Sequence, residues 1–138
     1  MLHNPSNPLL DLNNKNLHKF NIIKPQYDRL KLSPGIVHIG VGNFHRAHLS
    51  WYLHRLMQEN KDLDWGIIGA GVLNYDREMR QKLKKQNFLT TLIELDPNGN
   101  KNCEIVGSMI DYAPVEKNNL SLIKAISDSR IRIVSLTV

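Results

Sequence analysis

The stretch Ile36-Val37-His38-Ile39-Gly40-Val41-Gly42 decides how this chain folds. It follows the turn signal Ser33-Pro34-Gly35, and its β-branched residues predict a buried strand. The two glycines at its end predict a tight turn directly after that strand. From Arg46 to Met57, apolar residues recur near helical spacing, so a helix is expected to follow the turn.

The remainder of the chain continues this alternation. The expected elements are a strand at 65–70, an amphipathic helix at 76–86, a hairpin of 89–95 and 103–106 whose second strand extends toward Ile110, a helix at 120–126 and a final strand at 131–138. Strands that alternate with helices call for a parallel sheet with right-handed crossovers. The sequence therefore predicts a doubly wound, mostly parallel α/β fold.

Composition predicts one domain preceded by an arm. Residues 1–33 are rich in Asn, Lys and Pro with only short apolar groups, so they are expected to form an N-terminal arm outside the main fold. Residues 34–138 hold the alternating pattern and form the domain. Because the chain stops on an apolar strand, and such folds place ligand contacts in the loop after a strand, we expect this domain to be incomplete at its C-terminal end.

Several classes of protein are excluded by composition and spacing. The chain has no run of about 18 apolar residues and no secretory signal, which predicts a cytoplasmic protein with no membrane partner. The net charge of +5 is spread out. Its densest basic group, at 77–85, fits a solvated helix face, so no nucleic acid is expected as a partner. Cys103 is the single cysteine, and His45 and His48 lack a third ligand, so no metal site is expected.

The turn Gly40-Val41-Gly42 stands where a dinucleotide binds in a doubly wound fold. A pyrophosphate there needs backbone N–H groups at a helix start, and a side chain at either glycine would hold it off. Gly40 would make the turn, and Gly42 would admit the phosphates. A plain tight turn remains the alternative, because His45 replaces the third glycine of the fingerprint and Ala70-Gly71 stand where an acid is expected.

A second line of argument comes from the string Ile39-Gly40-Val41-Gly42-Asn43-Phe44-His45-Arg46-Ala47-His48. It resembles the N-terminal signature of the mannitol dehydrogenase family of long-chain, metal-independent polyol dehydrogenases and hexuronate reductases. Further pieces in register are Asp64-Trp65-Gly66-Ile67, Asp76-Arg77-Glu78-Met79-Arg80, Thr91-Leu92-Ile93-Glu94 and Arg132 to Val138. The resemblance spans about residues 33 to 138.

The resemblance implies a Rossmann-type domain that binds NAD or NADP, followed by a mainly helical substrate domain. The implied reaction is hydride transfer between the nicotinamide and C2 of a polyol or ketose, such as mannitol or fructose. The string is closer to the mannitol dehydrogenases than to the fructuronate and tagaturonate reductases, which remain an alternative. A second alternative is a truncated chain that catalyses no reaction. The oligomeric state is left open.

By this resemblance, the cofactor-binding residues are Gly40, Val41, Gly42, Asn43, Phe44, His45, Arg46 and Asp76. The catalytic lysine and its assisting Asn and His belong to the helical domain, so no catalytic residue is expected in this chain. Arg46 is expected either to add charge at the pyrophosphate or to pair with an acid of that domain. Asp76 either contacts the adenosine ribose, which favours NAD, or serves as the helix N-cap. The neighbouring Arg77 leaves NADP as an alternative, because its guanidinium could bind the 2′-phosphate of that cofactor.

Overall fold

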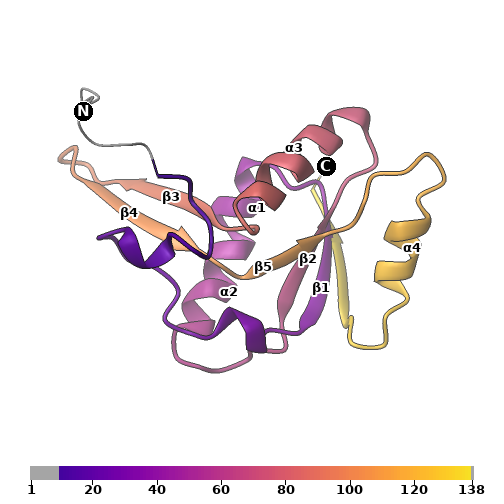
Figure 1. Ribbon diagram of the computed structural model, residues 1–138, viewed down its shortest axis with the longest axis horizontal. Helices are drawn as coiled ribbons and strands as arrows, with labels where there is room; N and C mark the ends of the chain where they lie inside the picture. Colours follow the sequence, from indigo (N-terminus) through magenta and orange to yellow (C-terminus); the bar gives the residue numbers. More distant parts are fainter. Residues whose placement is uncertain (1–9, 138) are drawn as a thin grey trace.

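A parallel sheet of four strands forms the centre of the molecule (Figure 1). The structure is a computed structural model that describes residues 10–137. The strands are β1 (Pro34–Ile39), β2 (Gly66–Ala70), β5 (Met109–Tyr112) and β6 (Ile133–Leu136). They lie in the order β5-β2-β1-β6, and every neighbouring pair is parallel. The predicted doubly wound α/β class is confirmed.

Helices cover both faces of this sheet. On one face lie α1 (Asn43–Ala47), α2 (Leu49–Met57) and α3 (Asn74–Lys85), and on the other lies α4 (Leu120–Ile126) (Figure 1). Successive residues of a strand point to opposite faces. Accordingly, Ile36 joins the core beneath α2 and α3, and Val37 joins the core beneath α4. The sheet is thus the middle of three layers.

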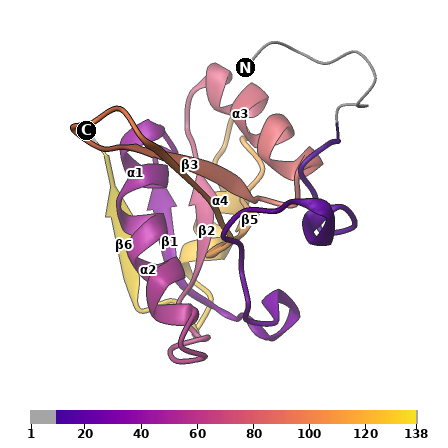
Figure 2. The same cartoon turned by 90° about the vertical axis from the view of Figure 1, so that its left-hand side faces the viewer.

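A hairpin lies beside the sheet, as the sequence predicts. Its strands, β3 (Thr90–Leu95) and β4 (Lys101–Val106), pair antiparallel. The carboxylate of Asp96 holds the connecting turn by accepting the backbone N–H groups of Asn98 and Asn100, each at 2.8 Å. Strand β3 contacts α1, and β4 contacts α2. Figure 2 shows the molecule from the side on which the hairpin lies.

The predicted extension of the second hairpin strand toward Ile110 is wrong. Strand β4 ends at Val106, and Met109–Tyr112 form the separate strand β5, which pairs with β2 in the parallel sheet. The chain passes between the two sheets at Gly107, where an added side chain would overlap Pro25 and Arg29. The local pattern of apolar residues does not reveal such a change of partner, because both strands are short and contain the same types of residue.

The helix after the glycine turn also begins earlier than predicted. The carbonyl of Gly42 accepts the N–H of Arg46 at 3.2 Å, so Gly42 is the N-cap and α1 begins at Asn43. The helix is broken at His48, whose φ of −121° and ψ of −92° separate α1 from α2. Apolar spacing missed this start because the first turn of α1 presents polar side chains next to the exposed Phe44.

The described part of the arm, residues 10–33, contacts the domain at several points, and residues 1–9 of the expected arm lie outside the described residues. It contains two short 3-10 helices, η1 (Leu17–Lys19) and η2 (Arg29–Lys31). Tyr27 is buried, and its hydroxyl lies 2.7 Å from Nδ1 of His54 in α2. The division of the chain after residue 33 stays a prediction. The last residue of the expected final strand, Val138, also lies outside the described residues.

Candidate functional site

The order of the strands reverses between β1 and β6. From β1 the chain moves outward through β2 to β5, and α4 then carries it back to β6 on the other side of β1. Open α/β sheets bind ligands outside the carboxyl ends of their strands at such a reversal. Here that point is occupied by Gly40 to Gly42, which follow β1, and by Thr137, which follows β6. The predicted glycine turn therefore lies where this topology places ligands.

The two glycines of the turn have different geometry. Gly40 has a φ of +93°, and an added Cβ would lie 3.3 Å from the carbonyl oxygen of Thr137. This is the conformation that a residue without a side chain adopts most readily. An added Cβ on Gly42 would meet no heavy atom within 4 Å. The backbone at Gly42 is therefore open to a ligand that comes close.

A cleft of about 390 Å³ opens over this turn. Its walls come from the turn, from α3 and from the end of β6: Gly40, Val41, Gly42, Tyr75, Asp76, Glu78, Met79, Lys82 and Thr137. The cleft brings together Gly40, Val41, Gly42 and Asp76 from the predicted cofactor set. Thr137 and Lys82 were missed by sequence reasoning. The helical spacing of Asp76, Met79 and Lys82 was the available signal, since residues three apart share a helix face.

Asp76 is buried at the start of α3. Its Oδ2 accepts the backbone N–H of Leu73 at 2.8 Å, and an added side chain on Gly71 would overlap its carboxylate. The interpretation of Asp76 as the N-cap is wrong in position, because α3 begins at Asn74 and Leu73 is the N-cap residue. The carboxylate still satisfies a free donor of the helix start, from the third helical position. It does so while forming part of the cleft wall.

Asn43 and Arg46 line a second, neighbouring cleft. It has a volume of about 350 Å³ and lies between α1, the end of α3 and β3. The side chain of Arg46 folds back toward the turn, where Nε donates to the carbonyl of Gly42 at 3.2 Å and the guanidinium donates to Oδ1 of Asn43. Among residues 10–137, Arg46 forms no ion pair. Phe44 is exposed and stacks on His48.

His45, which replaces the third glycine, is buried against β1. Its ring stacks on that of His38, with 3.8 Å between the centroids and 12° between the planes. Neither ring nitrogen of His45 has a hydrogen-bond partner among the described residues. Burial, followed by the charges that His38 and Arg46 carry when protonated, lowers the pKa of His45 to about 3. The stacked pair is therefore uncharged at neutral pH.

His38 connects this pair to the end of β6. Its Nδ1 lies 2.9 Å from Oγ of Ser135, and its Nε2 lies 3.0 Å from Oγ1 of Thr137. Burial lowers the pKa of His38, while a backbone hydrogen bond with Gly40 acts in the opposite direction. Sequence reasoning gave His38 no role. The alternation along β1 places it on the same face as Ile36, toward α1, which was the available signal.

A separate buried network joins the arm to the hairpin. Glu104 accepts from Nε1 of Trp51 at 2.8 Å, and its carboxylate lies 3.3 Å from Nε2 of His54. The other ring nitrogen of His54 faces the hydroxyl of Tyr27. Burial lowers the pKa of His54 to about 4, against the opposing effect of Glu104. Tyr27 and His54 are both buried, so these contacts hold the arm in place.

Within residues 10–137, no group of three or more His, Cys, Asp or Glu side chains is arranged to hold a metal ion. Over the same part of the chain, every helix is too short or too polar to cross a bilayer.

Comparisons with known proteins agree with this geometry. The family described as the mannitol dehydrogenase Rossmann domain matches residues 34–137. A mannitol 2-dehydrogenase of Cereibacter sphaeroides is 54% identical over 118 residues, which are 86% of this chain and 24% of that protein. A polyol:NADP oxidoreductase of Gluconobacter oxydans is 36% identical over 120 residues, again 86% of this chain and 24% of the relative.

A solved structure is also similar. It is the Pseudomonas fluorescens mannitol 2-dehydrogenase in a ternary complex with NAD and D-mannitol, with a TM-score of 0.87 and 37% identity. The match covers 93% of this chain and 26% of that one. The chain therefore spans about a quarter of the length of these relatives.

Proposed function

The chain belongs to the mannitol dehydrogenase family and contains its Rossmann domain, which binds a nucleotide cofactor, and on this premise we propose that the cleft over Gly40 to Gly42 binds NAD. The observation that carries the proposal is the position of this turn. It lies at the point where the strand order reverses, with open backbone at Gly42 and a buried carboxylate, Asp76, in the same cleft.

The residues of the turn fit a diphosphate. An anion approaches backbone N–H groups most closely where no side chain intervenes, and Gly42 offers that space. The first N–H groups of α1, at Asn43, Phe44 and His45, have no partner within the helix. Arg46 folds back over the same helix start and adds a positive charge next to it. We propose that these groups hold the pyrophosphate.

The wall of the cleft favours NAD over NADP. Asp76 lines it, and a carboxylate accepts hydrogen bonds from ribose hydroxyls but repels a 2′-phosphate. Arg77, the residue that kept NADP open, is absent from the lining, and its Nε donates to the carbonyl of Val115 at 3.2 Å. The Gluconobacter relative is named for NADP. In this chain Lys82 is a cation that lines the cleft. We propose that Asp76 repels the 2′-phosphate of NADP more strongly than Lys82 attracts it.

We propose further that the whole protein transfers a hydride between NAD and a polyol or ketose of the mannitol and fructose type. The nicotinamide of the bound cofactor supplies or accepts that hydride. In this proposal the residues of this chain bind and orient the nucleotide, and proton transfer is assigned, by resemblance to the family, to its helical substrate domain. By itself, the chain is expected to bind nucleotide without oxidising a polyol. A cytoplasmic location stays a prediction.

The decisive experiment measures binding of NAD, NADH and NADP to the purified chain by calorimetry and by thermal unfolding. A ligand that binds only the native state raises Tm, so NAD and NADH are expected to raise it and NADP to raise it less. Failure of a folded chain to bind NAD or NADH at millimolar concentration would contradict the proposal.

The matched variant is Gly42→Ala. Its φ of −91° suits alanine, and the added methyl group meets no protein atom within 4 Å, so the fold is expected to be kept. The methyl group stands where the diphosphate approaches, so affinity for NADH is expected to fall by about tenfold or more, which is ~1.4 kcal/mol. Unchanged affinity would show that the nucleotide does not approach this backbone.

A further inference from the structure

A row of polar side chains lies beside the cleft, between β1 and β6. His38 and Ser135 are directly opposite each other in the parallel pairing of these strands. The imidazole of His38 lies between two hydroxyl groups, Ser135 at Nδ1 and Thr137 at Nε2. Of the three residues, Thr137 lines the cleft. The row therefore leads from the interior of the sheet to the wall of the proposed nucleotide site.

An uncharged imidazole has one donor and one acceptor nitrogen. His38 is 5% exposed, and His45 covers its ring by stacking at 3.8 Å, so the surroundings favour the uncharged form. A neutral His38 donates to one of the two hydroxyls and accepts from the other. The choice of tautomer thus sets the direction of the hydrogen bond at Thr137.

Both hydroxyls can donate or accept, so either tautomer of His38 joins Ser135 and Thr137 through the ring. Gly40 and Thr137 lie together at the carboxyl ends of adjacent parallel strands. The ring of His38 therefore fixes the position of the Thr137 hydroxyl next to the turn that lines the cleft.

A hydroxyl that makes one hydrogen bond to His38 keeps a second hydrogen-bonding position for a ligand in the cleft. Resting on the proposed function, we propose that His38 is a positioning residue that holds the hydroxyl of Thr137 for a hydrogen bond to the bound nucleotide. Because His38 already fixes this hydroxyl, the nucleotide binds without having to order it. The hydrogen bond with Ser135 and the stacking on His45 fix the orientation of the His38 ring.

A double-mutant cycle on NADH affinity tests the proposal. Thr137→Val removes the hydroxyl and keeps the shape, and His38→Phe keeps a ring to stack on His45 and removes both nitrogens. Each variant is expected to bind NADH about fivefold more weakly, the size of one hydrogen bond. The double variant is expected to bind no more weakly than either single one, and Thr137→Ser is expected to retain the wild-type affinity.

A purely structural role gives a different pattern. His38→Phe would then lower Tm without changing the Kd for NADH, or the two losses of affinity would multiply in the double variant, and either result overturns the proposal. Should His38→Phe fail to fold, Ser135→Ala replaces it. That variant is expected to weaken NADH binding with Thr137 present and to have no effect in Thr137→Val.

One control variant and the wild-type chain separate this inference from the proposed function. Ser127→Ala also removes a hydroxyl, at the end of α4 and outside the lining of both clefts, and is expected to leave the Kd unchanged. A wild-type chain that does not bind NADH refutes the proposed function itself. A wild-type chain that binds NADH with the same Kd as Thr137→Val refutes the role of Thr137 and His38 alone.

Discussion

At the scale of single residues, Gly40 and Gly42 are two residues apart and are required for different reasons. Gly40 adopts a φ of +93° beside Thr137, and Gly42 adopts an ordinary extended conformation facing open space. Gly40→Ala is expected to destabilise the chain by about 1–2 kcal/mol, because an L side chain is strained at positive φ. Gly42→Ala is expected to change stability by less than about 0.5 kcal/mol. Urea unfolding of both variants checks this, and equal losses would contradict it.

His45 makes stability depend on pH. Its pKa of about 3 in the folded chain is below the 6.5 of the free side chain, so below pH 6.5 the unfolded chain binds a proton that the folded chain does not. The contribution of His45 to the free energy of unfolding is therefore fully present above pH 6.5 and decreases as the pH drops toward 3. At pH 5 the expected loss from this residue is about 2 kcal/mol.

His45→Phe keeps the stacked ring and removes the titration. We expect the loss of stability between pH 7 and pH 5 to be smaller in this variant, measured by urea unfolding at each pH. A remainder is expected from His54, whose pKa burial also lowers, to about 4. A variant as sensitive to acid as the wild type would show that His45 is protonated equally in both states.

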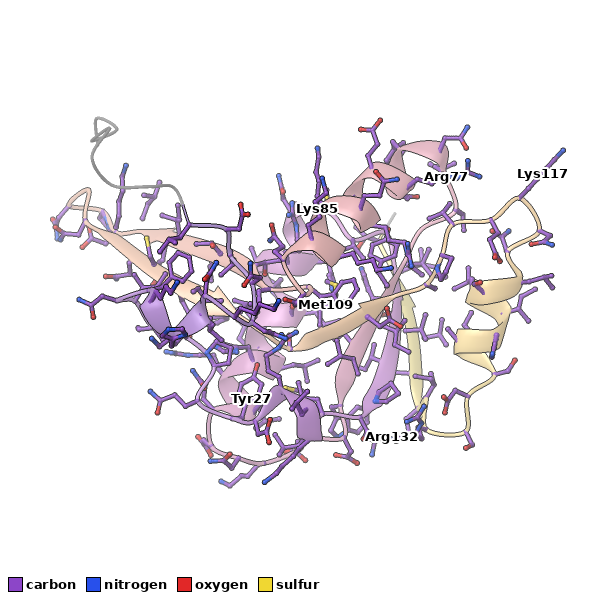
Figure 3. All side chains as sticks on the ribbon, viewed as in Figure 1. Tyr27, Arg77, Lys85, Met109, Lys117 and Arg132 are labelled. Atoms are coloured by element: carbon purple, nitrogen blue, oxygen red, sulfur yellow. The ribbon has the colours of Figure 1, made fainter. Side chains whose placement is uncertain are left out.

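At the scale of elements, Arg29 ties the arm to three parts of the domain. Its Nε donates to the carbonyl of Gly107 at 2.9 Å, and its NH2 group donates to the carbonyls of Met109 and Asn87, each at 2.8 Å. Figure 3 labels Met109 and the neighbouring anchor Tyr27. The bonds to Gly107 and Met109 satisfy carbonyls at the passage from β4 to β5, where the chain leaves the hairpin for the parallel sheet, and the bond to Asn87 reaches the connection between α3 and β3.

Arg29→Met is expected to destabilise the chain by about 2 kcal/mol, because it leaves partly buried carbonyls without donors. Arg29→Lys is expected to recover little, since one ammonium cannot reach all three carbonyls. Arg130→Ala is the control: among the described residues the Arg130 side chain pairs with Asp128 alone, on the surface, and its loss is expected to leave the urea midpoint almost unchanged. Equal effects of Arg29→Met and Arg130→Ala on the urea midpoint would contradict this role.

At the scale of the whole molecule, basic side chains are spread over several parts of the described chain. Arg77 and Lys85 lie toward opposite ends of α3, while Lys117 lies in the connection before α4 and Arg132 directly before β6 (Figure 3). Arg77 and Arg80 each donate to a backbone carbonyl, those of Val115 and Tyr112. The absence of a nucleic-acid partner stays a prediction, and electrophoretic mobility of duplex DNA at physiological salt measures it.

Stability is expected to be unequal across the molecule. Val37, Ile67 and Ala70, in the central strands β1 and β2, are fully buried, whereas Ile93 and Leu95 in the hairpin are more than half exposed, at 55% and 67%. Amide hydrogens of β1 and β2 are therefore expected to exchange only on global unfolding, and those of β3 by local opening. Hydrogen exchange with mass spectrometry resolves the two regions. Equal protection would show that the hairpin and the sheet unfold as one unit.

The sequence by itself determined the features that depend on neighbouring residues. Strand and helix periodicity predicted the parallel α/β class and the helix at 120–126, and the glycines predicted the turn after β1. These signals are local, because a strand or helix is defined by the spacing of residues along a few turns of chain. The resemblance of residues 39–48 to a family signature then pointed to a nucleotide.

Only the tertiary structure decided which distant residues meet. It separated β5 from the hairpin, placed Asp76 but not Arg77 in the cleft, and stacked His45 on His38. His38 and Thr137 are 99 residues apart in the chain and 3.0 Å apart in space. Such contacts depend on the register between strands, which the packing of whole faces sets and no short stretch of sequence encodes.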